Sequence, residues 1–248
     1  MRREAEGTSL SGAQQAAASA GLKSMIPDSR GRPFMEHIIS GLADVGVTDV
    51  ILVVAPGSSA IRDHFESRPP RRSTIRYAVQ QEPLGTADAL VAAEAAVAGR
   101  DFLAMNADNL YPEPAIRALL GLGEPGLVAF DRATLLSDGN IPAERVASFA
   151  LLSIDGDGYL ESLVEKPGPG TRSDLDGDWV SMNLWRFDSA IFTACREVPR
   201  SVRGEFELPQ AVMWAVERGQ RFRAVMLRAG VLDLSERGDV GAVAALLG

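Results

Sequence analysis

The sequence predicts a single domain of the α/β class, in which helices cover both faces of a mixed, mainly parallel β-sheet. Over the first two thirds of the chain, short apolar runs alternate with amphipathic segments of helical length, the pattern of a parallel doubly wound sheet. Later, Asp155-Gly156-Asp157-Gly158 separates two apolar runs and predicts a hairpin that adds antiparallel pairs. No repeat or low-complexity linker divides the 248 residues, so we expect one domain, with residues 1–20 as a variable N-terminal tail or insertion.

The individual elements follow from local patterns. Residues 49–55 and 102–105 are mostly apolar and suit strands that are buried on both faces of a sheet. Residues 32–45 repeat apolar side chains at helical spacing, and Gly46 ends that helix. The other strands are expected at 74–79, 126–130, 146–154, 159–164, 179–187 and 221–227. The other helices are expected at 12–20, 57–67, 113–120, 189–197, 206–218 and 239–247, and an Ala-rich helix opens from the loop at 80–90 and runs to about residue 98. An irregular stretch is expected through 138–140.

The helix at residues 32–45 poses a topological problem. A helix that leads into a parallel strand normally crosses over from another parallel strand of the same sheet. No strand-like run precedes this helix in the sequence. The crossover therefore lacks the strand from which it should start.

Composition excludes several classes of protein. The formal net charge of -8 argues against binding to nucleic acid or to an anionic membrane, which need a basic face. No window reaches the roughly 18 apolar residues of a membrane span. The first residues lack the apolar core of a secretory signal, so we expect a cytoplasmic protein.

Cysteine and histidine chemistry is also excluded. Cys195 is the only cysteine, so neither an internal disulfide nor a cysteine-based zinc site is expected. It lies in an apolar helical pattern, which suits a buried, unreactive thiol. His37 and His64 lie in helical patterns without a serine or cysteine motif beside them, so we expect neither a catalytic triad nor a histidine metal site.

Asp108 is the strongest single candidate for chemistry. It follows the apolar run at 102–105, at the expected C-terminal end of a parallel strand, where α/β sheets bind ligands. A structural reading competes with this one, because Asp108 could also cap the helix that starts near Pro112. Spacing alone leaves both readings open.

Further motifs follow one another in a fixed order along the chain. They are Leu22-Lys23-Ser24-Met25-Ile26-Pro27 with Arg32-Pro33-Phe34, residues 80–89 from Gln80 to Ala89, Asn106-Ala107-Asp108-Asn109, and Glu165-Lys166-Pro167. Asp233 in Val231-Leu232-Asp233 adds to them, and residues 203–208 add a weaker match. Through these motifs, the chain resembles the nucleotidyltransferases that activate sugar 1-phosphates, such as glucose-1-phosphate thymidylyl- and uridylyltransferases, over about residues 21–240. The resemblance implies a three-layer Rossmann-like (GT-A-type) fold.

The resemblance implies a reaction and a role for each matched residue. A sugar phosphate attacks the α-phosphorus of a nucleoside triphosphate and pyrophosphate leaves, so the protein mainly positions two anionic reactants. Asp108 and Asp233 would hold Mg²⁺ as hard oxygen ligands from opposite sides of the crevice. Catalytic roles fall to Lys23, Lys166 and Asp108, nucleotide binding to Lys23, Gln80, Gly85 and Thr86, and sugar-phosphate binding to Glu165, Lys166 and Asn183.

Each of these residues also has a plain structural reading. Lys23 could be a solvated loop lysine, and Glu165-Lys166 an exposed strand end. Gln80 could cap the helix that follows it, and Asp233 could be an ordinary turn residue. Only the occurrence of all the motifs in order favours the functional reading.

The chain departs from the family at its N-terminus. Family members begin with a strand and a glycine-rich loop whose N–H groups and arginine cradle the triphosphate, and no such strand precedes residue 21 here. Aligning Met1-Arg2 with the end of that loop makes residues 3–20 an insertion and predicts that the first strand is lacking. That strand would lie centrally, between residues 49–55 and 101–107. We therefore expect two unpaired strand edges and a chain that is poorly soluble or much less active than an upstream-extended version.

Alternatives remain for the activity and its substrates. A non-catalytic nucleotide-sugar sensor or regulatory subunit would not need both Asp108 and Asp233, and a glycosyltransferase would need an Asp-x-Asp motif that Asn106-Ala107-Asp108 only half supplies. Ala150 stands where family members usually have a glycine near the sugar, and Asn183 stands at another position of a small residue, which argues against a plain glucose substrate. The base and the sugar stay open, and a homo-oligomer is possible.

Overall fold

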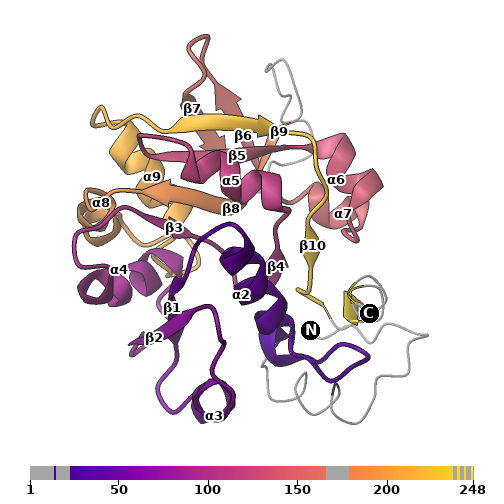
Figure 1. Ribbon diagram of the computed structural model, residues 1–248. Helices are drawn as coiled ribbons and strands as arrows, with labels where there is room; N and C mark the ends of the chain where they lie inside the picture. Colours follow the sequence, from indigo (N-terminus) through magenta and orange to yellow (C-terminus); the bar gives the residue numbers. More distant parts are fainter. Residues whose placement is uncertain are drawn as a thin grey trace.

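The computed structural model describes residue 14, residues 23–165 and 179–236, and residues 239, 240, 243 and 247. In these parts of the chain, helices lie on both faces of a sheet, as expected from the sequence (Figure 1). None of the helices in the described ranges is long and apolar enough to cross a membrane.

The central strand of the sheet is β8 (Trp179–Phe187), which is nine residues long. On one edge it pairs antiparallel with β5 (Gly126–Asp131), and β5 pairs in parallel with β9 (Arg223–Leu227). On its other edge β8 pairs antiparallel with β6 (Ala150–Ile154) at one end and with β3 (Phe102–Ala104) at the other. The sheet is therefore mixed, and the hairpin of β6 with β7 (Leu160–Val164) extends it.

Two further strand pairs stand apart from this sheet. β1 (Asp49–Val54) and β2 (Thr74–Val79) form a parallel pair in full register. β4 (Asn109–Leu110) and β10 (Leu232–Asp233) form a short antiparallel pair.

Two hydrophobic cores lie on opposite faces of the sheet. Along β5, Val128 and Phe130 belong to one core and Leu127 and Ala129 to the other, because side chains alternate along a strand. The first core packs against α2 (Phe34–Asp44) and α5 (Glu113–Leu120). The second packs against α4 (Thr86–Val97), α8 (Ile191–Glu197) and α9 (Leu208–Val216). The thiol of Cys195 in α8 is buried, as predicted, and burial raises its pKa to about 12.

The order of elements follows the sequence prediction closely, with two errors. β2, β8 and α5 have the predicted bounds, and α3 (Ser59–Ser67) begins two residues later than predicted. The stretch before residue 139, expected to be irregular, contains α6 (Arg132–Asp138). The strand predicted from residue 146 begins only at Ala150, because α7 (Ala143–Val146) and a turn precede it. The Asp131 carboxylate caps α6 by accepting hydrogen bonds from the N–H and hydroxyl of Thr134, at 2.8 and 2.7 Å.

The predicted terminal helices lie mostly outside the described residues. Of residues 12–20 only Gln14 is described, and it is helical. The four described residues between 239 and 247 are helical as well.

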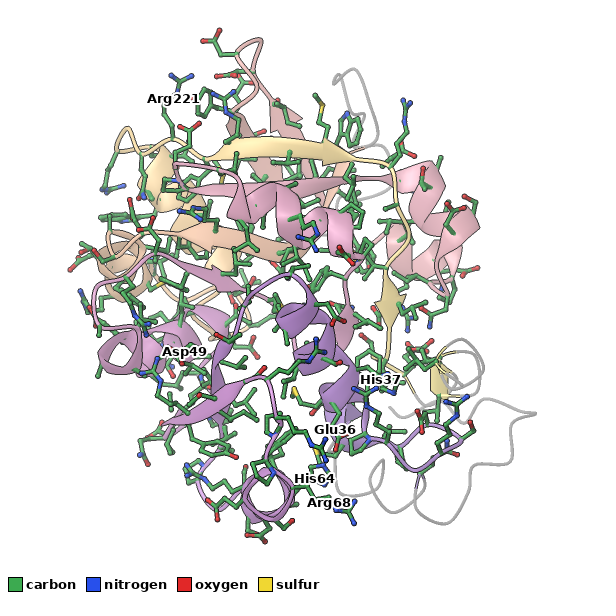
Figure 2. All side chains as sticks on the ribbon, viewed as in Figure 1. Glu36, His37, Asp49, His64, Arg68 and Arg221 are labelled. Carbon is green, nitrogen blue, oxygen red and sulfur yellow. The ribbon has the colours of Figure 1, made fainter. Side chains whose placement is uncertain are left out.

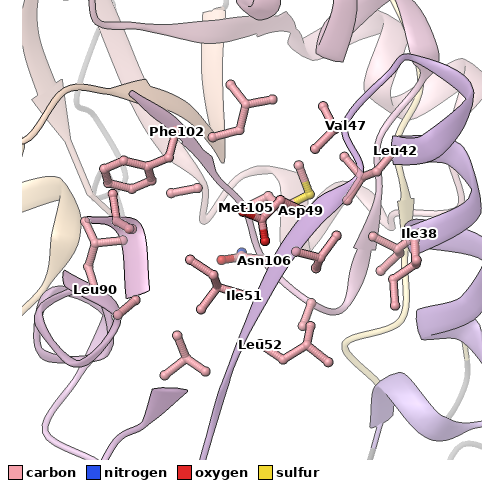
Figure 3. A pocket seen from close by; sticks show the side chains of 18 of the residues that line it. Ile38, Leu42, Val47, Asp49, Ile51, Leu52, Leu90, Phe102, Met105 and Asn106 are labelled. Atoms are coloured by element: carbon pink, nitrogen blue, oxygen red, sulfur yellow. The ribbon is translucent and has the colours of Figure 1, made fainter. Parts of the chain in front are cut away.

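A cavity of about 630 Å³ lies between β1 and β3 (Figure 3). Within the described ranges, β1 pairs only with β2 and β3 only with β8, so one edge of each strand faces this cavity without a ladder partner. Ile38 and Leu42 of α2 and Leu90 of α4 also line it. We call this cavity the strand gap.

Candidate active site

A short strand pair brings Asp108 and Asp233 together beyond the carboxyl end of β3. β4 pairs with β10 so that Asn109 lies opposite Asp233. The N–H of Leu234 donates to the carbonyl of Asp108 over 2.8 Å, and the Ser235 hydroxyl lies 3.5 Å from the Asp108 carboxylate. The structure thus unites the two acidic residues that the sequence motifs singled out.

The two carboxylates repel each other in a largely buried setting. Burial raises the pKa of Asp108, and the charge of Asp233 raises it further, while Lys23 and the Ser235 hydroxyl act in the opposite direction. Asp233 is only 3% exposed. A cation between the two groups would remove this repulsion, so the pair could hold a hard divalent metal ion. The described residues contain no cluster of three or more His, Cys, Asp and Glu side chains suited to a metal.

Asn140 fixes the main chain of Asp233. Its amide nitrogen donates to the Asp233 carbonyl over 2.7 Å, and its amide oxygen accepts from the Asp233 N–H over 2.8 Å. The Ser235 N–H then donates to the Asp233 carboxylate over 2.6 Å. The Asn140 side chain therefore makes the two main-chain hydrogen bonds that a neighbouring strand would otherwise make to Asp233 of β10.

Two glycines allow this close contact. A Cβ on Gly230 would lie 2.3 Å from the Asp138 carbonyl oxygen, and one on Gly139 would lie 2.9 Å from the Val231 carbonyl oxygen. Both distances are shorter than a Cβ tolerates, so a side chain at either position would push the two segments apart. Asn140 could then no longer reach Asp233.

Arg145 in α7 contacts the acidic side chains of Asp239 and Asp233. Its guanidinium donates to both carboxylate oxygens of Asp239 at 2.9 Å and lies 3.9 Å from the Asp233 carboxylate. The N–H of Glu236 donates to Asp239 as well, over 2.7 Å. Arg145 thus places a partly buried positive charge beside Asp233 and ties α7 to the segment that follows β10.

Lys23 lies beside the carboxylate pair. It begins a 3-10 turn (Lys23–Met25), it is exposed, and its ammonium donates to the carbonyl of Ser235. The charge of Lys23 lowers the pKa of Asp108, so the two groups sense each other. Three sequence candidates, Lys23, Asp108 and Asp233, therefore meet in one place.

The predicted nucleoside residues form a separate, tightly fixed loop after β2. The Gln80 amide donates to the Gly85 carbonyl over 3.0 Å and to the Asp88 carboxylate over 2.8 Å. Gly85 has a φ of 115°, and a Cβ there would lie 2.4 Å from the Phe206 carbonyl oxygen. In this structure the glycine thus permits close approach of Phe206.

Thr86 ties the same loop to α9. Its hydroxyl accepts a hydrogen bond from the N–H of Leu208 over 2.9 Å, at the start of that helix. The N–H of Phe206 donates to the Leu84 carbonyl over 2.7 Å, and the N–H of Ala87 donates to the Phe206 carbonyl over 2.9 Å. Residues 203–208, the weakest sequence match, therefore support the loop from Gln80 to Thr86.

The same segment reaches the predicted sugar side of the site. The side chains of Glu165 and Glu207 are hydrogen-bonded, and this contact is the largest of the effects that lower the pKa of Glu207 to about 2; Ser201 and Arg203 lower it further. Arg203 donates to Glu207 at 2.9 and 2.6 Å. Glu207 was missed from the sequence as a site residue. Lys166 lies outside the described residues.

Asn183 occupies an unusual backbone conformation in β8. Its φ of 56° lies in the left-handed region, which asparagine tolerates better than most side chains. The register of β8 against β5 shifts at this point, so Asn183 lies in a bulge. It also lines the strand gap.

The comparison with protein families decides the relationship. The nucleotidyl transferase family matches residues 18–247. The chain belongs to this family. The matched range contains Lys23, Asp108 and Asp233, the three residues that the fold brings together.

Several curated proteins are similar to this family member. Bifunctional protein GlmU from Methanococcus maripaludis is 27% identical over 218 residues, which are 88% of this chain and 47% of GlmU. UTP–glucose-1-phosphate uridylyltransferase AglF from Haloferax volcanii is 26% identical over 82% of this chain and 79% of AglF. Glucose-1-phosphate thymidylyltransferase from Streptomyces antibioticus is 26% identical over 84% of this chain and 56% of the thymidylyltransferase. The chain spans about half the length of the GlmU proteins that it matches.

Solved structures share the fold. UDP-glucose pyrophosphorylase complexed with UDP-glucose aligns with a TM-score of 0.72 at 15% identity, over 91% of this chain and 90% of that one. HddC from Yersinia pseudotuberculosis aligns with a TM-score of 0.67 at 20% identity, over 92% and 90%. The β-sheet and its flanking helices are thus those of the wider family.

Proposed function

We propose that this protein transfers a nucleotidyl group from a nucleoside triphosphate to a sugar 1-phosphate or a sugar-like phosphate, forming an NDP-sugar and releasing pyrophosphate. The observation that carries this proposal is the meeting of Asp108, Asp233 and Lys23 at one edge of the sheet. Relatives named as uridylyl- and thymidylyltransferases of glucose 1-phosphate support this choice of reaction.

The carboxylate pair fits Mg²⁺. Mg²⁺ usually binds through one or two carboxylates and completes its shell with water and substrate phosphates, so two acidic residues are a sufficient protein contribution. Mg²⁺ held by Asp108 and Asp233 would neutralise phosphate charge and stabilise the departing pyrophosphate. The repulsion that raises the pKa of Asp108 supports this assignment, because it is the repulsion that a bound cation would remove.

The protein's own residues mainly position the reactants. The sugar phosphate carries the attacking oxygen and the triphosphate carries the leaving group, so no side chain needs to act as the nucleophile. Lys23 would attract the triphosphate beside the carboxylate pair, and Lys166 would attract the sugar phosphate. Asn140, Arg145 and Ser235 hold the carboxylates so that the charged groups need not rearrange during the reaction.

The pair of Glu165 and Glu207 would bind sugar hydroxyls. The hydrogen bond with Glu165 is the first of the effects that lower the pKa of Glu207 to about 2, so Glu207 offers an ionised carboxylate at neutral pH. A sugar hydroxyl could donate to this carboxylate in place of Glu165. Such a contact would make this end of the site selective for a hydroxylated ligand.

The test is Mg²⁺-dependent pyrophosphate release from UTP, dTTP, GTP, CTP and ATP, each with glucose 1-phosphate and with mannose 1-phosphate. We expect release only when both substrates and Mg²⁺ are present, and none from Asp233→Asn. A folded protein that binds nucleotides but releases no pyrophosphate with any pair would contradict the proposal and favour a non-catalytic sensor.

A further inference from the structure

A second cavity, of about 540 Å³, lies away from the residues described so far. It is enclosed by the loop before α2, α2 itself, the end of α3 and the connection from α3 to β2. Neither Asp108 nor Asp233 lines it. We call it the arginine pocket, after the five arginines that line it: Arg30, Arg32, Arg68, Arg71 and Arg72.

The pocket concentrates positive charge in an acidic protein. Five arginines and a single acidic residue, Glu36, line it, although the whole chain has a net charge of -8. Glu36 is already engaged, since it accepts from His64 at 2.7 Å and lies 3.3 Å from Arg32 (Figure 2). Glu36 thus pairs with Arg32, and among the residues that line the pocket it is the single carboxylate beside five guanidinium groups.

Two of the arginines, Arg68 and Arg71, have no partner within the described part of the chain. Arg72, by contrast, is held by Asp44 and by the Ser40 hydroxyl. Arg68 and Arg71 are exposed and form no ion pair and no side-chain hydrogen bond with the described residues. Their guanidinium groups are available to a ligand without first breaking a contact.

The floor of the pocket is apolar, whereas its rim carries the arginines. Ile39 and Phe65 are 2% and 3% exposed and give the pocket an apolar floor. The Ser73 hydroxyl lines the pocket and is buried without a hydrogen-bond partner among the described residues. Buried polar atoms normally have partners, so this hydroxyl marks a place where a polar ligand atom would fit.

The chemistry of the lining selects a class of ligand. Guanidinium groups bind phosphate through paired N–H donors, and several arginines together suit a group with several charged oxygens. The apolar floor suits a flat, uncharged part of the same molecule. The volume falls within the roughly 300–1,000 Å³ of ordinary small-molecule sites.

We propose that the arginine pocket binds a phosphate-bearing small molecule with a flat apolar part, such as a nucleoside diphosphate, at a site separate from the Asp108–Asp233 pair. The loop that carries Arg30 and Arg32 is fixed in shape, because both N–H groups donate to the Asp28 carboxylate, at 2.8 and 2.9 Å. Asp28 in turn contacts His37 over 2.9 Å. The rim is therefore preformed.

Binding of ADP and of inorganic tripolyphosphate, measured by calorimetry in EDTA, tests the proposal without any dependence on activity. We expect Arg68→Ala with Arg71→Ala to weaken ADP binding roughly tenfold or more, because each lost charge-assisted hydrogen bond is worth about that factor. Lys23→Ala should leave this binding unchanged. ADP should bind more tightly than tripolyphosphate, because only ADP can use the apolar floor.

A matched control separates the pocket from general charge. Arg132→Ala with Arg228→Ala removes the same charge from residues that do not line the pocket, and it should not weaken binding. The proposal is overturned if the folded wild type binds neither probe, if the two double variants lose affinity equally, or if only Lys23→Ala abolishes binding. Equal affinity for ADP and tripolyphosphate would overturn the assignment of the flat apolar part.

Discussion

The amide of Asn140 hydrogen-bonds both main-chain groups of Asp233, at 2.7 and 2.8 Å. This contact links a loop after α6 to the carboxylate that would hold the metal. It makes Asn140 a positioning residue for the site.

Asn140→Ala should therefore weaken both the fold and the activity. Without the Asn140 amide, the buried N–H and carbonyl of Asp233 have no hydrogen-bond partner, which lowers the free energy of unfolding by about 1–3 kcal/mol. Misplacing a metal-holding carboxylate costs roughly 10- to 100-fold in metal affinity or rate. Urea denaturation and the Mg²⁺ concentration for half-maximal rate measure the two effects. The exposed neighbour Ser137→Ala is the control, and equal behaviour of the two variants would contradict the role of Asn140.

Asp108→Asn should stabilise the metal-free protein while abolishing turnover. The raised pKa of Asp108 means that the folded state binds its proton more tightly than the unfolded state does. Metal-free stability therefore falls as the pH rises from the ordinary carboxyl range through the raised pKa, and the neutral amide avoids this loss. Melting curves at pH 7 should show a higher midpoint for Asp108→Asn in EDTA and a Mg²⁺-induced rise only in the wild type. A lower midpoint in EDTA would count against repulsion between the carboxylates.

Glu207 should make stability depend on pH at the acid end. Its pKa of about 2 lies below the ordinary 4.5, so its contribution is complete above pH 4.5 and is lost as the pH falls from 4.5 towards 2. Glu207→Gln should flatten the fall in unfolding free energy across this range, whereas the exposed Glu197→Gln should not. Parallel pH profiles for both variants and the wild type would contradict the assignment.

Gly85→Ala should destabilise the fold, because the added methyl group lacks room and because alanine is strained at this backbone conformation. A Cβ there would meet the Phe206 carbonyl oxygen at 2.4 Å, whereas Gly57 also has a positive φ but has open space around it. Gly57→Ala should cost about 1 kcal/mol from backbone strain alone, and Gly85→Ala distinctly more. Urea denaturation of the two variants measures the difference. Equal losses of unfolding free energy in the two variants would show that residues 203–208 can move aside to make room for the added methyl group.

The strand gap predicts that an added strand stabilises the molecule. Among the described residues, one edge of β1 and one edge of β3 line it without a ladder partner, and apolar side chains of α2 and α4 line it on either side. A version extended upstream by an apolar strand and a glycine-rich loop should melt at a higher temperature, protect the β1 and β3 amides from hydrogen exchange, and be more active. A 248-residue chain that is already well folded and as active as the extended form would contradict this expectation.

The sequence predicted those features that depend on local pattern. The alternation of apolar runs and helical segments predicted β1, β2, α5 and β8, because periodicity reports burial directly. The helix without a preceding strand in the sequence led us to expect a missing strand, and that expectation remains a prediction. By contrast α6 was missed, although its cap, Asp131 followed by Thr134, was visible as a local signal.

The site was predictable only in part, for a physical reason. Motif order singled out Asp108, Asp233 and Lys23, which the fold does bring together. Asn140 and Glu207 act through contacts with residues far away in the chain, and no local pattern reveals such a partner. The roles assigned to Gln80, Gly85 and Thr86 remain predictions, because in this structure their contacts are with neighbouring main chain and Asp88.

The central claim is most directly tested by following the α-phosphorus. The protein would be incubated with Mg²⁺, a sugar 1-phosphate and a nucleoside triphosphate labelled at the α-phosphorus, and the products separated. The account predicts label in the NDP-sugar, none in the released pyrophosphate, and no labelled product from Asp108→Asn. Label that stays entirely in the triphosphate for every substrate pair, with wild-type protein that is folded, would contradict it.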